Sequence, residues 1–148
     1  TTEGSSESIV LSGSVADGVE IFYGMGSKSG TTSHNGTDLT TAGVTYTAGA
    51  VTVGAQLTDI DKTAVNSDVE RTHIAVSFAV NENMSVSYGL STVEFESASK
   101  VDQTDNGIAV SYTMGSMTLA AFQNKSDDVG GTSGTEDVVT EVSLAFAF

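Results

Sequence analysis

The C-terminal end of the chain alternates strictly between large apolar side chains and small or polar ones. Residues 142–148 read Val-Ser-Leu-Ala-Phe-Ala-Phe, so every second side chain is apolar and the final one is aromatic. A period of two residues is the pattern of a β-strand with two unlike faces. An apolar stripe that ends in an aromatic residue favours a strand that faces lipid, which points to a transmembrane β-barrel.

The same alternation, interrupted at regular intervals, predicts nine strands. Gly, Asn and Asp residues typical of tight hairpin turns occur at 17–18, 49–50, 81–83 and 115–116, at steps of about 33 residues. Longer polar segments alternate with these turns, at 27–37, 62–68, 96–105 and 126–136. The expected strands are 7–16, 19–27, 38–48, 51–61, 70–80, 84–94, 107–114, 117–125 and 137–148. Their lengths suit a tilted strand that crosses a bilayer, which takes roughly 9–11 residues.

The two faces of these expected strands differ in chemistry. One face is apolar and we expect it to contact lipid, whereas the other is small and polar and we expect it to line water. The predicted pore-lining side chains are Gln56, Thr58, Arg71, His73, Ser85, Ser87 and Glu141. The predicted lipid-facing aromatic girdle is Tyr23, Tyr46, Phe78, Tyr88, Tyr112, Phe146 and Phe148.

The positions of the aromatic residues favour a membrane protein. Tyr46, Phe78 and Tyr112 lie three residues before a tight turn, and Tyr23 and Tyr88 lie five residues after one. We therefore expect one aromatic band near the tight-turn end, as is found at a membrane interface. The alternative is a soluble all-β extracellular module, in which the apolar face would be the inside.

Composition narrows the function classes. The chain of 148 residues has 39% hydrophobic residues, a mean hydropathy of +0.03, no proline and no cysteine. No apolar run approaches the ~20 residues of a membrane-spanning helix, and the lack of proline suits long strands. The net charge of −14 argues against a nucleic-acid partner, which would require clustered Lys and Arg.

The chain resembles the general porins of Gram-negative outer membranes, most closely the alphaproteobacterial type, in three respects. These are the closing strand that ends in Phe148, the alternation of short turns with long loops, and the acidic, Thr- and Gly-rich composition. The resemblance covers the whole chain. It implies an antiparallel up-and-down transmembrane β-barrel, usually a homotrimer, whose aqueous pore passes ions and small hydrophilic solutes.

The number of strands suggests part of such a barrel. Residues 1–148 form one expected segment that ends in the closing strand 137–148. We expect the last nine strands of a roughly 16-stranded barrel, which at about 33 residues per hairpin needs roughly 270 residues. The alternative is a smaller complete outer-membrane barrel that acts as an anchor or adhesin through its surface loops.

Few residues carry candidate chemistry. Arg71, with His73 beside it, is a candidate for the basic pore wall that the resemblance implies, and Lys125 is a weaker one. Acids at the loop rim, Asp59 with Asp61 and Asp127 with Asp128, are possible Ca²⁺ ligands because hard cations prefer oxygen donors; a solvated acidic rim is the alternative. No catalytic set of residues stands out, so we expect neither an enzyme nor a required cofactor.

Overall fold

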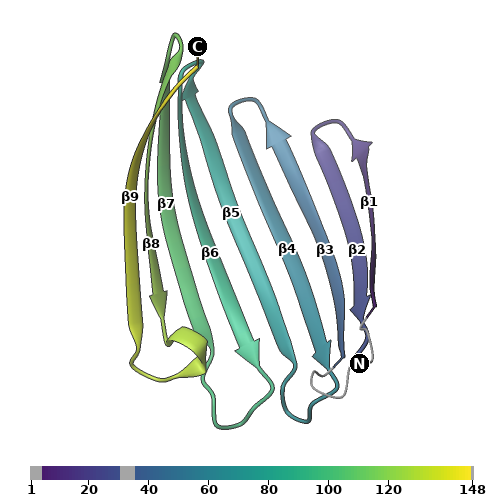
Figure 1. The fold of residues 1–148 in the computed structure, drawn as a ribbon. Helices are drawn as coiled ribbons and strands as arrows, with labels where there is room; N and C mark the ends of the chain where they lie inside the picture. The colour runs from purple at the N-terminus through teal and green to yellow at the C-terminus, as the bar shows by residue number, and fades with distance from the viewer. Residues whose placement is uncertain (1–4, 31–35, 148) are drawn as a thin grey trace.

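The protein folds as a single curved sheet. The computed structural model describes residues 5–30 and 36–147. Its elements are β1 (Ser6–Ala16), β2 (Val19–Lys28), β3 (Thr37–Ala48), β4 (Val51–Lys62), β5 (Val69–Asn81), β6 (Met84–Phe95), β7 (Gln103–Met114), β8 (Met117–Asp127), the 3-10 turn η1 (Val129–Gly131) and β9 (Glu136–Phe146). Each strand pairs antiparallel with the next one along the chain, so the spatial order is the sequence order (Figure 1). The predicted all-β, up-and-down architecture is confirmed.

The short and long connections lie at opposite ends of the sheet. Figure 1 shows the tight turns and the C-terminus at one end, and the longer loops at the other. Gly18, Gly49 and Gly115 each have a positive φ, between 59° and 70°, which is the backbone conformation that such turns require. The third turn uses an asparagine instead, since the amide N–H of Asn83 donates to Asn81 Oδ1 at 2.9 Å.

The convex face of the sheet is apolar and exposed. Along β4, Val51, Val53, Ala55 and Leu57 are exposed, while the residues between them are half-buried and Thr58, which follows, is buried. The less exposed side chains belong to the concave face, where curvature crowds them together. Large apolar side chains on the convex face reach exposures of 65% at Leu11 and 68% at Val142. A soluble protein rarely exposes an apolar surface of this extent, so the arrangement contradicts the soluble alternative.

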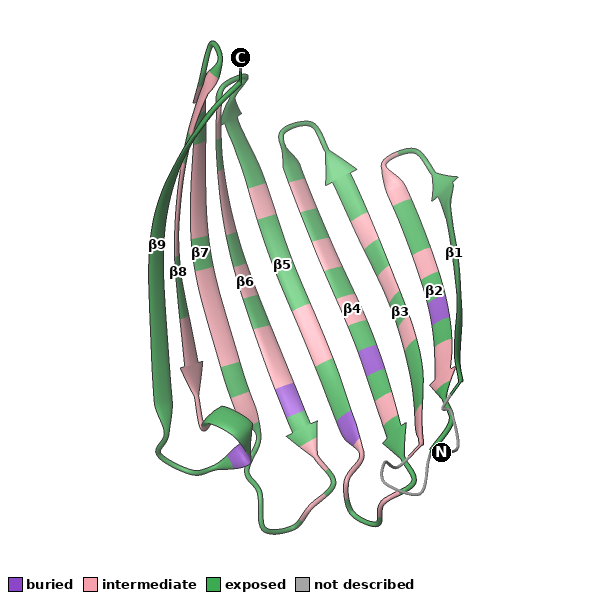
Figure 2. Cartoon of the chain, viewed as in Figure 1, coloured by how far each residue is buried: buried purple, intermediate pink, exposed green. Residues whose placement is uncertain are grey.

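Few residues of the sheet are buried. Figure 2 shows that most of every strand is exposed or intermediate. Among the described residues the buried ones are Gly24, Thr58, Val69, Val93 and Gly131. The four that lie in strands occupy the concave face. There is thus a single layer without a second layer packed on it, and the residues 5–30 and 36–147 include no helix long and apolar enough to cross a membrane.

Several strands differ from the predicted ones: β8 extends to Asp127 beyond the predicted end at 125, and the closing strand β9 is Glu136–Phe146 where 137–148 was predicted. β7 begins at Gln103 and not at Gly107, because polar residues continue the ladder beyond the apolar alternation. The register shifts between Ser14 and Ala16 and between Ala79 and Asn81, so a bulged residue lies next to each of two tight turns. The edge strands β1 and β9 are not paired with each other within the described part of the chain.

Candidate functional site

The concave face carries every residue that was predicted to line a pore. Cross-strand partners share a face, and the register pairs Gln56 with His73 and Thr58 with Arg71 across β4 and β5. The same register places Ser85 and Ser87 of β6 and Glu141 of β9 on that face. The structure therefore brings these seven residues to one polar wall. That the wall lines a pore stays a prediction.

A hydroxyl–amide cluster orders the middle of this wall. Gln56 Nε2 donates to Thr41 Oγ1 at 3.1 Å and to Thr58 Oγ1 at 3.2 Å. The hydroxyls of Thr41 and Thr58 lie 3.0 Å apart, and that of Thr41 also donates to the Leu57 carbonyl at 3.1 Å. Thr58 is only 8% exposed, so its polar group is satisfied within the protein and not by water.

Arg71 presents an unpaired positive charge on the concave wall. It is exposed and forms no ion pair with any acid of the described residues. His73 lies two residues further along the same face, opposite Gln56 and Ser91. The concave acids are Glu20, Asp105, Asp137 and Glu141, all on other strands. The wall therefore has a positive group on β5 and carboxylates to either side of it.

Lys125 does not belong to this wall, and the prediction that it did is wrong. In β8 the neighbouring Asn124 pairs with Gly107 on the concave face, so period-two alternation places Lys125 on the convex face. There its Nζ lies 3.0 Å from Asp127 Oδ1 and 2.9 Å from Glu136 Oε2. Both acids are on the same face at the long-loop rim, so this lysine is neutralised outside the candidate pore.

Six of the seven predicted girdle residues lie on the convex face, but they do not form one row. Tyr46 pairs with Val19 beside a tight turn, whereas Tyr23 pairs with Ala42, four residues further along β2. Phe78, Tyr112 and Phe146 lie close to the turns, and Tyr88 lies two cross-strand pairs further in than Phe78. Phe148 is outside the described residues.

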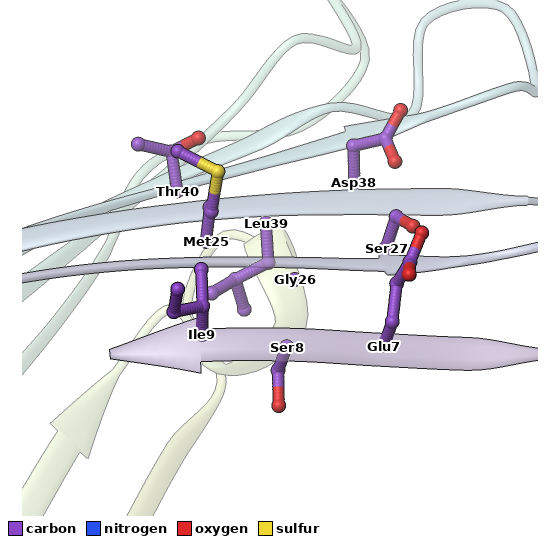
Figure 3. Close-up of a pocket in the computed structure, with 9 residues that line it drawn as sticks. All are labelled: Glu7, Ser8, Ile9, Met25, Gly26, Ser27, Asp38, Leu39 and Thr40. Atoms are coloured by element: carbon purple, nitrogen blue, oxygen red, sulfur yellow. The ribbon is translucent and has the colours of Figure 1, made fainter. Parts of the chain in front are cut away.

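The convex face changes from apolar to acidic near the long loops. In β1–β3 the row Ile9–Met25–Thr40 is followed by the row Glu7–Ser27–Asp38, and these side chains surround a shallow hollow of about 400 Å³ (Figure 3). On β4–β6 the Ile9–Met25–Thr40 row continues as the acidic row Asp59–Glu70–Glu94, and the Asp38 row continues at Asp61. This change from apolar to charged side chains is expected where hydrocarbon gives way to lipid headgroups.

The candidate calcium ligands are not brought to one place. Asp59 and Asp61 lie on β4, whereas Asp127 ends β8 and is paired with Lys125. Asp128 Oδ1 accepts the amide N–H of Gly134 at 2.7 Å within its own loop. No group of three metal-ligating side chains occurs in the part of the chain that the structure describes. Calcium binding at this rim stays a prediction.

Two long loops are joined above β7, which the sequence pattern did not reveal. The amide N–H of Gly130 donates to Gln103 Oε1 at 2.8 Å, and Gln103 Nε2 donates to Asp105 Oδ1 at 2.8 Å. Lys100 Nζ donates to the Gly130 carbonyl at 2.8 Å and lies 4.2 Å from the centre of the Phe95 ring. These bonds hold the loop that contains η1 against the loop before β7. Through Gln103 they also fix the Asp105 carboxylate on the concave wall.

Comparison with known proteins agrees with this geometry. No curated protein matches the chain. The family model for Gram-negative porins matches residues 7–143, which span β1 through most of β9. Porins are channel proteins of the outer membrane and not enzymes, and the polar concave wall and apolar convex face are what such a channel needs. The chain belongs to the Gram-negative porin family and is located in the Gram-negative outer membrane.

Proposed function

We propose that this chain forms part of the wall of an aqueous pore through which ions and small hydrophilic solutes diffuse passively. The observation that carries the proposal is the separation of the two faces: hydroxyl, amide and charged side chains on the concave side, and exposed aliphatic and aromatic ones on the convex side. In lipid every backbone polar group must be satisfied, which a closed barrel achieves. Solutes would then be selected by pore width and wall charge, without chemistry.

The free edges of the sheet support a larger barrel. β1 and β9 each have one unpaired side within the described residues, and an open edge is not tolerated in hydrocarbon. We propose that further strands of the same protein close the barrel, as in a roughly 16-stranded porin, and that three such barrels associate. The alphaproteobacterial type is part of the same proposal. A small complete barrel serving as an anchor would need β1 and β9 to pair directly.

The test is conductance of the protein purified from outer membranes in detergent and inserted into planar lipid bilayers. We expect stepwise ion conductance and, in proteoliposomes, swelling in small sugars that stops above a size limit. The subunit mass is measured in parallel, denatured and undenatured. A denatured mass near 15 kDa would contradict the larger barrel, and bilayers without conductance steps would contradict the pore.

A further inference from the structure

A polar hollow lies on the concave wall over β5–β8, apart from the Gln56–Thr58 cluster. Its volume is about 630 Å³, within the usual range for small-molecule sites. Its floor is formed by small residues, since Gly89 of β6 pairs with Ala75 on one side and with Gly107 on the other. Its sides are formed by longer polar side chains of β5, β7 and β8.

The glycines of the floor are not required by the backbone. Neither Gly89 nor Gly107 has a positive φ. A side-chain carbon added at Gly89 would find its nearest neighbours at 3.8 Å and 3.9 Å, which is ordinary contact. Glycine inside a strand weakens the strand, and it often marks a place where another molecule approaches closely. Gly107 lets the amide of Asn124 lie over the strand, where a Cβ would otherwise meet it.

The sides of the hollow present unused hydrogen-bonding groups. His73, Ser91 and Asp105 are consecutive partners in one cross-strand row, so His73 and Asp105 stand two strand spacings apart, about 10 Å, with a hydroxyl between them. Within the described residues the side chains of His73, Ser91 and Asn124 make no hydrogen bond to the protein. They are free to bind a solute.

The carboxylate of the hollow is held in place. Gln103 donates to one oxygen of Asp105, and Gln103 is itself held by the amide of Gly130. The second oxygen of Asp105 has no protein partner in the described part of the chain. A carboxylate fixed in this way accepts hydroxyl donors without first losing side-chain freedom, which is the arrangement of a preorganised binding group.

We infer that this hollow is a weak binding site for a neutral polyhydroxylated solute of about hexose size, passing through the channel. The inference rests on the proposed pore function. Hydroxyl, amide and imidazole groups, which donate and accept, outnumber the single carboxylate, and that mixture matches a solute whose own hydroxyls do both. Binding must stay weak for a permeating solute, with half-saturation on the order of millimolar.

The experiment measures single-channel ion conductance, divided by bulk conductivity, as glucose is added to the detergent-purified protein in planar bilayers. We expect this ratio to fall and saturate in the wild type. Gly89→Leu fills the hollow and Asp105→Asn removes its charge, and each should raise the half-saturating concentration about tenfold or abolish saturation. Ser111→Leu adds the same side chain to the same wall outside the hollow and should bind glucose like the wild type.

Other outcomes separate the alternatives. A conducting wild type whose ratio stays constant with glucose overturns the site but not the pore, whereas an absence of conductance overturns both. Saturation that is equal in Gly89→Leu, Asp105→Asn and wild type overturns the assignment to this hollow. Saturation by arginine but not by glucose overturns the polyhydroxylated class and assigns the hollow to organic cations.

Discussion

The ammonium group of Lys125 and the carboxylate of Glu136 lie 2.9 Å apart on the convex face, at the rim where the long loops begin. Asp127 lies 3.0 Å from the same nitrogen, so this cation is shared between two acids. On the concave face Arg71 has no such partner among the described residues. Of the five Lys and Arg residues of the chain, Lys125 therefore lies on the convex face with its charge neutralised by acids. Arg71 lies on the concave face, where its charge can act on ions.

This separation predicts different effects of charge reversal on ion selectivity. Arg71→Glu should shift the cation-to-anion permeability ratio toward cations by about twofold, since a wall charge acts directly on ions in the pore. Lys125→Glu, the matched control, should leave the ratio unchanged because its side chain faces away from the pore. The ratio is read from reversal potentials across a salt gradient. Equal shifts in both variants would show that the face assignment of Lys125 is wrong.

The two faces can also be distinguished by a pair of neighbouring residues in β4. Val53 lies in the apolar band of the convex face, and Thr52 lies on the concave face. Val53→Arg should destabilise the folded barrel by about 1 kcal/mol, because Val53 pairs with Tyr46 near the tight-turn interface, where a lipid-facing arginine costs less than the roughly 2–4 kcal/mol at the bilayer midplane, whereas Thr52→Arg should cost far less. Urea unfolding in lipid vesicles measures both. An equal loss in the two variants would contradict a lipid-facing convex surface.

The sheet could be predicted from the alternation of residues such as Thr52 and Val53. Polar residues of one face and apolar residues of the other each recur at every second position. The alternation fails where strands leave the lipid. At Gln103 both neighbours are polar, so the pattern could not show that β7 starts there. Alternation from the inward-facing Asn124 would have placed Lys125 on the convex face. Because Lys125 lies near the predicted end of its strand, the sequence did not show that the alternation still held there. The bonds from Gly130 through Gln103 to Asp105 join residues far apart in sequence, and no local pattern predicts them.

Thr58 should contribute to stability through its hydroxyl. It is buried, and that oxygen accepts from Gln56 and contacts the hydroxyl of Thr41. Thr58→Val keeps the shape but leaves the Gln56 amide short of an acceptor, which should cost about 1–2 kcal/mol in the free energy of unfolding. Thr52→Val is the matched control, because its 2.9 Å hydroxyl contact with Thr47 is exposed to water. If Thr52→Val lowers the free energy of unfolding as much as Thr58→Val does, the contribution of the Thr58 hydroxyl does not depend on its burial.

The pair Phe22 and Gly43 predicts a site where one methyl group is not tolerated. They are cross-strand partners on the concave face, and the Phe22 ring fills the space that a Cβ at Gly43 would occupy. The Ala55 carbonyl oxygen would lie 2.9 Å from that Cβ, so the strand backbone also restricts it. Gly43→Ala should therefore destabilise the barrel by about 1–3 kcal/mol through overpacking.

Three further variants distinguish the contribution of the Phe22 ring from that of the Ala55 backbone to this loss of stability. Gly54→Ala is the control, since its Cβ would meet only the Thr45 methyl at 3.3 Å and the Val44 carbonyl oxygen at 3.6 Å, and it should cost less. Adding Phe22→Ala to Gly43→Ala should recover part of the loss, because the ring contact disappears while the Ala55 contact remains. The wild type, Phe22→Ala, Gly43→Ala and the double variant form a double-mutant cycle, measured by urea unfolding. Strict additivity of Phe22→Ala and Gly43→Ala would mean that the ring does not occupy the glycine's space.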